Sequence, residues 1–162
     1  MRKTTLCTAT VRTPLGAVLL VSNGKALTGV FTKKDKAPRD AVLAPRGNNR
    51  ALKEAKSQLK EFFQGKRKRF TVPLEMAGTP FQKKVWKALT AIPYGQTISY
   101  RQLAKMVGKP KAARAVGNAN RENPVCIVVP CHRVIATGGG IGGYAGGLAR
   151  KRWLLAHERS TA

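Results

Sequence analysis

The residues best suited to chemistry in this chain are Cys131 and His132, in the run Pro130-Cys131-His132-Arg133. An apolar stretch, 125–129, precedes the run and predicts a buried strand, and a glycine-rich segment, 138–147, follows it. The thiolate is the reactive form of cysteine, and a free thiol has a pKa of about 8.5. A nucleophile at neutral pH therefore needs a base or a positive field. His132 offers the base, and the basic residues around it offer the field.

The alternative is that Cys131 is buried and inert, as most cysteines are. The number of histidines and carboxylates that could activate Cys131 decides between the two interpretations. The chain has only two histidines and, beyond residue 78, only two carboxylates: His132, His157, Glu122 and Glu158. A relay of cysteine, histidine and acid within this half must draw on that short set, and we favour Cys131 as the nucleophile.

The charge balance points to a polyanionic partner. The 162 residues include 31 Lys and Arg against 7 Asp and Glu, a net charge of +24. Nucleic acid is the natural partner for such a chain. An acidic membrane surface is the competitor, but the sequence shows no long basic amphipathic helix. The apolar content of 43% is ordinary for a globular protein.

The cysteine pattern predicts neither a disulfide framework nor a metal site. The three cysteines, Cys7, Cys126 and Cys131, include no CxxC pair, so we expect no structural zinc and no cofactor. On an extended strand the thiols of Cys126 and Cys131 would lie on opposite faces, too far apart to bridge, which makes Cys126 a packing residue. No signal peptide or membrane span is evident, and a cytoplasmic protein is predicted.

The spacing of apolar residues predicts an α+β fold in two domains, 1–74 and 75–162. The first should be a β-meander of strands at 8–11, 17–21 and 26–31, followed by a helix at 49–64 and a strand at 70–74. The second should be mainly helical. Thr79-Pro80 and Ser99 mark helix starts, and 111–120 and 148–158 have helical spacing. The helix after Ser99 and the small, basic helix at 111–120 read as a helix-turn-helix.

From residue 78 onward the sequence resembles the O6-alkylguanine-DNA alkyltransferases. The matching segments agree in order and spacing and cover about half the chain: Gly78-Thr79-Pro80-Phe81-Gln82, Ile92-Pro93-Tyr94-Gly95, Ser99-Tyr100, Arg114-Ala115-Val116-Gly117, Asn123-Pro124, 129–135, 142–148 and 153–158. The first half matches mainly in architecture, as a meander and helix like the ribonuclease-H-like lobe of that family.

The resemblance implies direct repair of duplex DNA that contains O6-alkylguanine, with O4-alkylthymine as a further candidate. The alkyl group would move irreversibly to Cys131, which is used once. His132 would act through a water molecule, Glu158 would orient His132, and Asn123 would brace the turn before the active site. The alkyltransferase-like proteins, which bind the lesion without repair, replace the cysteine that this chain keeps.

The resemblance also implies a base pocket and a DNA-binding face. Tyr100 would help turn the target phosphate and line the pocket, Tyr144 would close it, and Val134 and Ala145 would border the base, with Ala145 affecting tolerance for bulky alkyl groups. Arg114 would intercalate in place of the extruded base. The other DNA-binding residues would be Ala115, Gly117, Lys111 and Arg121, on a helix docked in the minor groove.

Two other functions remain open on sequence alone. A helix-turn-helix regulator or lesion sensor would use Cys131 only structurally, and its binding would not change in Cys131→Ala. A cysteine hydrolase would need an oxyanion hole and a water path, and it would not explain the charge. We expect the protein to be a monomer that can cluster on DNA.

Overall fold

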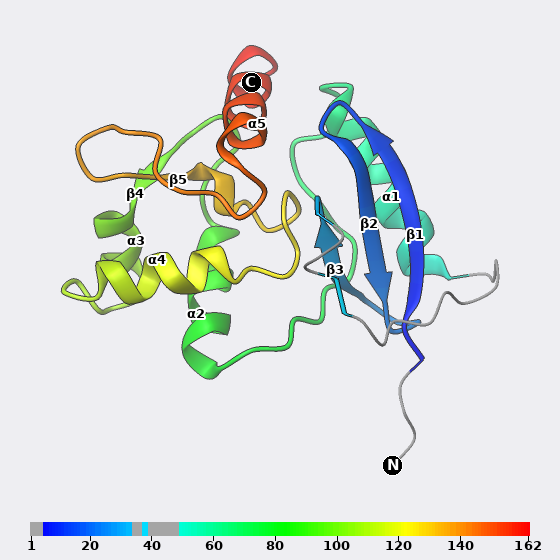
Figure 1. Cartoon of the computed structure of the whole chain (residues 1–162), viewed down its shortest axis with the longest axis horizontal. Helices are drawn as coiled ribbons and strands as arrows, with labels where there is room; N and C mark the ends of the chain where they lie inside the picture. The colour runs from blue at the N-terminus through cyan, green and yellow to red at the C-terminus, as the bar shows by residue number, and fades with distance from the viewer. Residues whose placement is uncertain (1–4, 34–36, 39–48) are drawn as a thin grey trace. The chain divides into compact units, whose positions relative to one another are not determined.

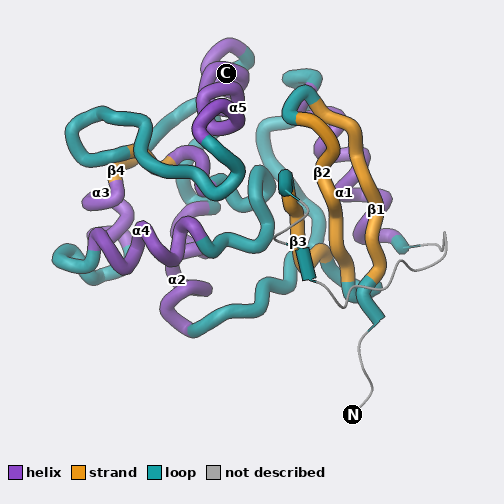
Figure 2. Tube along the Cα trace, in the orientation of Figure 1, coloured by secondary structure: helices purple, strands orange, loops and turns teal. Residues whose placement is uncertain are grey.

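The computed structural model describes residues 5–33, 37–38 and 49–162. The chain divides into two compact units, Met1–Met76 and Ala77–Ala162, which appear in blue to cyan and in green to red in Figure 1. The first unit holds the three-stranded sheet, and the second is built mainly from helices and loops (Figure 2). The predicted α+β fold is confirmed.

The first unit is an antiparallel meander packed on one helix. Its strands, β1 (Cys7–Thr13), β2 (Gly16–Ser22) and β3 (Leu27–Phe31), pair in sequence order. Strand residues alternate between the two faces of a sheet, and the buried set includes Val18, Leu20 and Val30. Helix α1 (Arg50–Phe63) contributes Leu59 and Phe62 to the same core.

Only part of the strand predicted at 70–74 forms. Leu74 makes a single parallel bridge to Leu27, supported by hydrogen bonds from Leu27 N to Pro73 O at 2.8 Å and from Glu75 N to Leu27 O at 3.0 Å. Pro73 has no N–H, and a residue that cannot donate limits the length of a ladder. The segment therefore runs beside β3 without becoming a full strand.

Four α-helices make up most of the second unit. They are α2 (Pro80–Leu89), α3 (Tyr100–Met106), α4 (Ala113–Arg121) and α5 (Leu148–Ser160). The side chains of Thr79 and Ser99 accept hydrogen bonds from the backbone N–H of Gln82 and Gln102, three residues later. The side chains of these glutamines accept in turn from the backbone N–H of Thr79 and Ser99, which completes two capping boxes. Both helix starts predicted at these residues are correct.

Helices α3 and α4 form the predicted helix-turn-helix, joined by the turn at 107–112. Helix α4 begins two residues later than predicted, at Ala113. Its buried side carries Val116 and Ala119, and the carbonyl oxygen of Ala119 accepts a hydrogen bond of 2.8 Å from the buried Trp86 of α2. This contact fixes α4 against α2 and leaves its other side to solvent.

The apolar stretch 125–129 is a compact turn, and the strand predicted there is wrong. Val129 N donates to Val125 O at 3.0 Å and Val128 N to Cys126 O at 2.9 Å, while Ile127 adopts a φ of 74°. A short apolar run indicates burial without distinguishing a strand from another buried segment. Here a neighbouring asparagine satisfies the backbone groups that a sheet would otherwise pair.

A short 3₁₀ helix, Cys131–Arg133, follows this turn and leads into β5 (Val134–Ile135). Strand β5 pairs in parallel with β4 (Ile98–Ser99), which directly precedes α3. This two-residue ladder links the cysteine segment to the start of the helix-turn-helix. No helix within the described ranges is long and apolar enough to cross a membrane.

Candidate active site

Cys131 lies at the start of the 3₁₀ helix and is 3% exposed. Its N–H donates to Val129 O at 2.9 Å, and its carbonyl oxygen accepts from Asn120 Nδ2 at 3.3 Å. Asn120 comes from the last turn of α4. The backbone of the cysteine is therefore tied both to the preceding turn and to the second helix of the helix-turn-helix.

Asn123 holds the turn that precedes Cys131. Its Nδ2 donates to Val129 O at 2.8 Å, and its Oδ1 accepts from Val125 N at 2.9 Å. One buried amide thus spans both ends of the turn. Replacing it would leave the buried Val125 N–H without a partner, which is destabilising by about 1–3 kcal/mol, while Val129 O would keep its hydrogen bond from Cys131 N.

The surroundings of Cys131 favour its ionised form. A hydrogen bond from the Cys126 thiol lowers the pKa of Cys131; burial opposes this, and a hydrogen bond from Asn123 and the charge of Lys151 lower it further. The net direction is downward, which increases the thiolate fraction at neutral pH. The sequence-based expectation that Cys126 and Cys131 lie apart on opposite faces is wrong, because the turn brings their thiols into contact.

Glu158 connects the cysteine segment to α5 through a buried network. Its carboxylate lies 2.7 Å from His132 Nε2 and accepts from Arg133 Nε at 2.8 Å and from Arg133 Nη2 at 2.9 Å. Arg133 Nη1 also donates to Ile92 O at 2.7 Å. His132 and Glu158 are 0% and 1% exposed, so this network is shielded from solvent.

The network determines which nitrogen of His132 carries the proton. An ionised carboxylate only accepts, so Nε2 must donate to Glu158, and Nδ1 of the neutral ring is left with a free lone pair. Burial lowers the pKa of His132 despite the neighbouring Glu158, which keeps the ring neutral at physiological pH. Among the residues the structure describes, Nδ1 has no hydrogen-bond partner, so the imidazole does not bond the Cys131 thiol directly.

The pKa of Glu158 is low in spite of its burial. Burial alone raises it, but the hydrogen bonds from His132 and Arg133 outweigh that effect and bring the pKa down to about 2. Glu158 is therefore ionised throughout the physiological range and compensates the buried guanidinium of Arg133.

Lys151 belongs to this site, and sequence reasoning missed it. The side chain is fully buried, and Nζ donates to Val134 O at 2.6 Å and to Gly143 O at 2.9 Å. Burial lowers its pKa to about 8, with the nearby Cys131 acting in the opposite direction. The available signal was spacing, because Lys151, Leu154 and Glu158 recur at three and four residues and share the buried side of α5.

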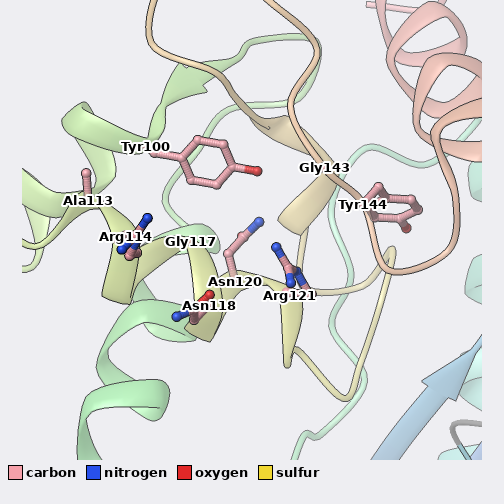
Figure 3. Close-up of a pocket in the computed structure, with 9 residues that line it drawn as sticks. All are labelled: Tyr100, Ala113, Arg114, Gly117, Asn118, Asn120, Arg121, Gly143 and Tyr144. Atoms are coloured by element: carbon pink, nitrogen blue, oxygen red, sulfur yellow. The ribbon is translucent and has the colours of Figure 1, made fainter.

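A cavity of about 450 Å³ lies against α4 (Figure 3). That volume is in the range of small-molecule sites. Its lining combines tyrosines from α3 and from the glycine-rich loop with polar and basic residues of α4: Tyr100, Ala113, Arg114, Gly117, Asn118, Asn120, Arg121, Gly143 and Tyr144. Cys131 does not line it, but its charge acts on the pKa of both tyrosines.

Gly142 makes room for the Tyr100 ring. A Cβ at Gly142 would lie 3.1 Å from that ring, which is a tight contact, whereas a Cβ at Gly117 would make an ordinary contact at 3.5 Å. Gly142 also has a φ of 71°, in the region that favours glycine. Burial raises the pKa of Tyr100 and, more strongly, that of Tyr144, so both hydroxyls stay protonated.

The remaining residues singled out from the sequence divide between the interior and the surface. Val134 is fully buried on β5 and Ala145 is half-buried on the glycine-rich loop. Gly117 is half-buried, and the other residues expected to bind DNA are exposed: Lys111, Arg114, Ala115 and Arg121. The cavity beside α4 therefore brings together the expected pocket residues Tyr100 and Tyr144 with three of the expected DNA-binding residues, Arg114, Gly117 and Arg121.

These features define a class of protein. A buried cysteine with a lowered pKa lies near a cavity of about 450 Å³, and basic residues of the second helix of a helix-turn-helix line that cavity. Residues 80–160 match the family model described as the 6-O-methylguanine DNA methyltransferase DNA binding domain, and residues 6–76 match the ribonuclease-like domain of the same family. The chain belongs to the 6-O-methylguanine DNA methyltransferase family, which confirms the resemblance seen in its motifs.

Individual relatives agree with the family match along nearly the whole chain. The methylated-DNA–protein-cysteine methyltransferase of Methanosarcina barkeri is 43% identical over 150 residues, covering 93% of this chain and 95% of that protein. The Mycobacterium leprae protein of the same name is 46% identical over 147 residues, covering 90% and 88%. The crystal structure of Mycobacterium tuberculosis OGT in complex with DNA superposes with a TM-score of 0.89 at 42% identity, covering 96% of this chain and 94% of that one.

Proposed function

We propose that this protein repairs O6-alkylguanine in duplex DNA by moving the alkyl group to its own Cys131. The observation that carries the proposal is a buried thiol stabilised in its ionised form beside a cavity that α4 borders. The family and the relatives named above support the same activity. O4-alkylthymine is a further candidate substrate.

The reaction is a displacement at the alkyl carbon. The S–C bond to Cys131 forms as the O6–C bond breaks, and guanine leaves with the electron pair and takes up a proton. A thiolate is a suitable nucleophile for this carbon, and the thioether product is stable. Each molecule therefore acts once.

His132 and Glu158 prepare the nucleophile. The lone pair at His132 Nδ1 takes the thiol proton through a water molecule, while Glu158 holds the ring by its Nε2–H. Asn123 keeps the preceding turn in place and donates to the thiolate. In this scheme, Cys131 is the catalytic nucleophile and the other three residues activate or position it.

The extruded base occupies the cavity. Tyr100 and Tyr144 are its aromatic walls, and Val134 and Ala145 border the base at the thiol end. Because Cys131 is almost fully covered, the glycine-rich loop at 138–147 gives way to admit the base. The size of residue 145 then affects which alkyl groups fit.

Helix α4 supplies the DNA contacts. Extruding a nucleotide costs a few kcal/mol, so a side chain must fill the space that the base leaves. Arg114 takes this place in the duplex. Ala115 and Gly117 allow close approach to the minor groove, and Lys111 and Arg121 contact phosphates.

The remaining expectations concern organisation. Residues 75–162 carry DNA binding and catalysis, and residues 1–74 form the ribonuclease-H-like domain. The protein works as a monomer that can cluster on DNA, in the cytoplasm, without a metal or cofactor.

The activity is tested by repair of a defined duplex with one O6-methylguanine. Guanine should be restored up to one equivalent per protein and then stop, and Cys131→Ala should restore none while still binding the duplex. Continued turnover would indicate a different chemistry, and repair by Cys131→Ala would overturn the assignment of the nucleophile.

A further inference from the structure

Cys126 is a second thiol in the site, and its sulfur forms no bond in the alkyl transfer. Its side chain is 7% exposed, and its thiol hydrogen-bonds the Cys131 sulfur. The same thiol lies 3.7 Å from Asn123 O, so its proton has a second acceptor when Cys131 is neutral. The contact depends on the turn at 125–129, which folds the chain back within five residues.

We propose that Cys126 and Cys131 form a reversible redox pair, in which Cys126 converts an oxidised Cys131 into an intramolecular disulfide. The inference rests on the proposed role of Cys131 as a reactive thiolate. The turn gathers both thiols into one buried cluster, with Cys126 Sγ 3.7 Å from Asn123 O and Cys131 N 2.9 Å from Val129 O, so the two side chains are placed to form an S–S bond. Cys7 is on β1 of the other unit and has no place in this pair.

The oxidant is a peroxide. The Cys131 thiolate attacks one peroxide oxygen, the O–O bond breaks, and Cys131 becomes a sulfenic acid as hydroxide leaves. The Cys126 thiol then attacks the Cys131 sulfur, forms the S–S bond and displaces the oxygen as water, with the Cys126 proton completing that water. The two thiols lose two electrons and the peroxide gains two.

The pair would protect a nucleophile that the protein can use only once. A sulfenic acid without a neighbouring thiol is open to further oxidation to sulfinic acid, which reductants such as dithiothreitol do not reverse. The disulfide instead blocks alkyl acceptance only until it is reduced. Cys126 therefore keeps the protein recoverable under oxidising conditions.

The test follows the peptide that carries both cysteines. Trypsin cuts after Arg121 and Arg133 and releases residues 122–133 with Cys126 and Cys131 together. After treatment with hydrogen peroxide and acid quenching, this peptide should have lost two hydrogens and should not react with iodoacetamide. Dithiothreitol should restore both its mass and the acceptance of a benzyl group from O6-benzylguanine.

Variants at two cysteines supply the controls. In Cys126→Ser, with Cys126→Ala as a second replacement, peroxide should add oxygen to Cys131 and dithiothreitol should not restore acceptance. Cys7→Ser should behave like the natural protein. Addition of oxygen to Cys131 at the same rate with and without Cys126, or a disulfide that involves Cys7, would overturn the inference.

The two proposals fail in different ways. A protein that forms the disulfide but never accepts an alkyl group when reduced would retain the redox pair and lose the proposed function. A protein that accepts the alkyl group but forms no disulfide would show the reverse.

Discussion

The charges around Cys131 explain why a deeply buried thiol can ionise. Arg133 and Lys151 bring two positive charges into the interior, and Glu158 brings one negative charge. Buried charge is costly unless it is compensated, so a thiolate at Cys131 completes a neutral set. The same residues hold the backbone and the imidazole in place. Ionisation of the nucleophile is therefore coupled to the stability of this part of the fold.

Replacing Lys151 should make the thiol less reactive. Lys151→Met removes a positive charge that lowers the pKa of Cys131, so the pH profile for reaction with O6-benzylguanine should move upward. The rate at pH 7 should fall, because a smaller fraction of Cys131 is ionised there. Stopped assays across a pH series measure this, with Arg152→Met, at an exposed position of the same helix, as the matched control. An unchanged profile would show that Lys151 acts only on the backbone.

Glu158 should make the protein sensitive to acid. Its pKa in the folded protein, about 2, lies below its ordinary value of 4.5, so folding favours the ionised form. The resulting stabilisation is present above pH 4.5 and is lost as the pH falls toward 2; it amounts to roughly 3 kcal/mol. Urea unfolding of the natural protein should show this loss.

Glu158→Gln separates this contribution from that of other carboxylates. The variant leaves the buried Arg133 without its counter-charge, so its free energy of unfolding at pH 7 should be lower by about 3–5 kcal/mol. Its stability should then vary less between pH 4.5 and pH 2 than that of the natural protein. Equal acid dependence in both proteins would contradict the low pKa of Glu158.

At the scale of elements, one helix carries both residues that we propose to bind DNA and a residue that bonds the Cys131 backbone. Helix α4 presents Arg114 and Arg121 on its exposed side, and its last turn contributes Asn120, which bonds the Cys131 backbone. The capping boxes of α2 and α3 determine where the neighbouring helices begin. A movement of α4 on DNA would therefore reach Cys131 through a direct hydrogen bond.

A comparison of two substrates separates the role of Arg114 in base extrusion from any role in the alkyl transfer itself. Arg114→Ala should slow repair of duplex DNA by about tenfold to a hundredfold, because the extruded state loses a stabilising contact of one to a few kcal/mol. Reaction with free O6-benzylguanine needs no extrusion and should hardly change. Arg101→Ala, at an exposed position of α3, is the matched control. Equal losses on both substrates would place Arg114 in the active site instead.

The elements differ in how far the sequence predicted them. The helices had local signals, such as Thr79-Pro80 and Ser99 at the starts of α2 and α3, and the meander had turn residues between apolar runs. The turn at 125–129 had no such signal, because hydrogen bonds from the Asn123 side chain to its two ends hold it and Ile127 adopts a positive φ. The position of Cys126 followed from that turn. Lys151 was hidden among exposed basic residues, and only its spacing from Glu158 marked it.

At the scale of the whole molecule, the net charge of +24 favours binding to a polyanion such as DNA. In the second unit the only carboxylates are Glu122 and Glu158, and Glu158 is buried against Arg133. The exposed basic residues of α4 therefore face almost no competing negative charge from their own unit. Phosphate contacts of this kind release counterions and weaken as salt increases.

DNA affinity should fall steeply with salt concentration. Each neutralised phosphate contributes about −0.9 to the slope of log K against log salt, so Lys111→Gln should make the slope less negative by about that amount. Fluorescence anisotropy with an undamaged duplex measures the slope. Lys56→Gln, at an exposed position of α1, should leave it unchanged. A flat response of the natural protein would remove the electrostatic basis for DNA binding.

The most direct test of the whole account is the intact mass of the protein after incubation with a duplex that contains O6-methylguanine. We predict that every active molecule gains one CH₂ unit in mass, once only, and that peptide mapping places the methyl group on Cys131. An unchanged mass despite tight binding to the lesion would contradict the account and make the protein a lesion sensor. A methyl group on Cys7 or Cys126 would contradict the identity of the nucleophile.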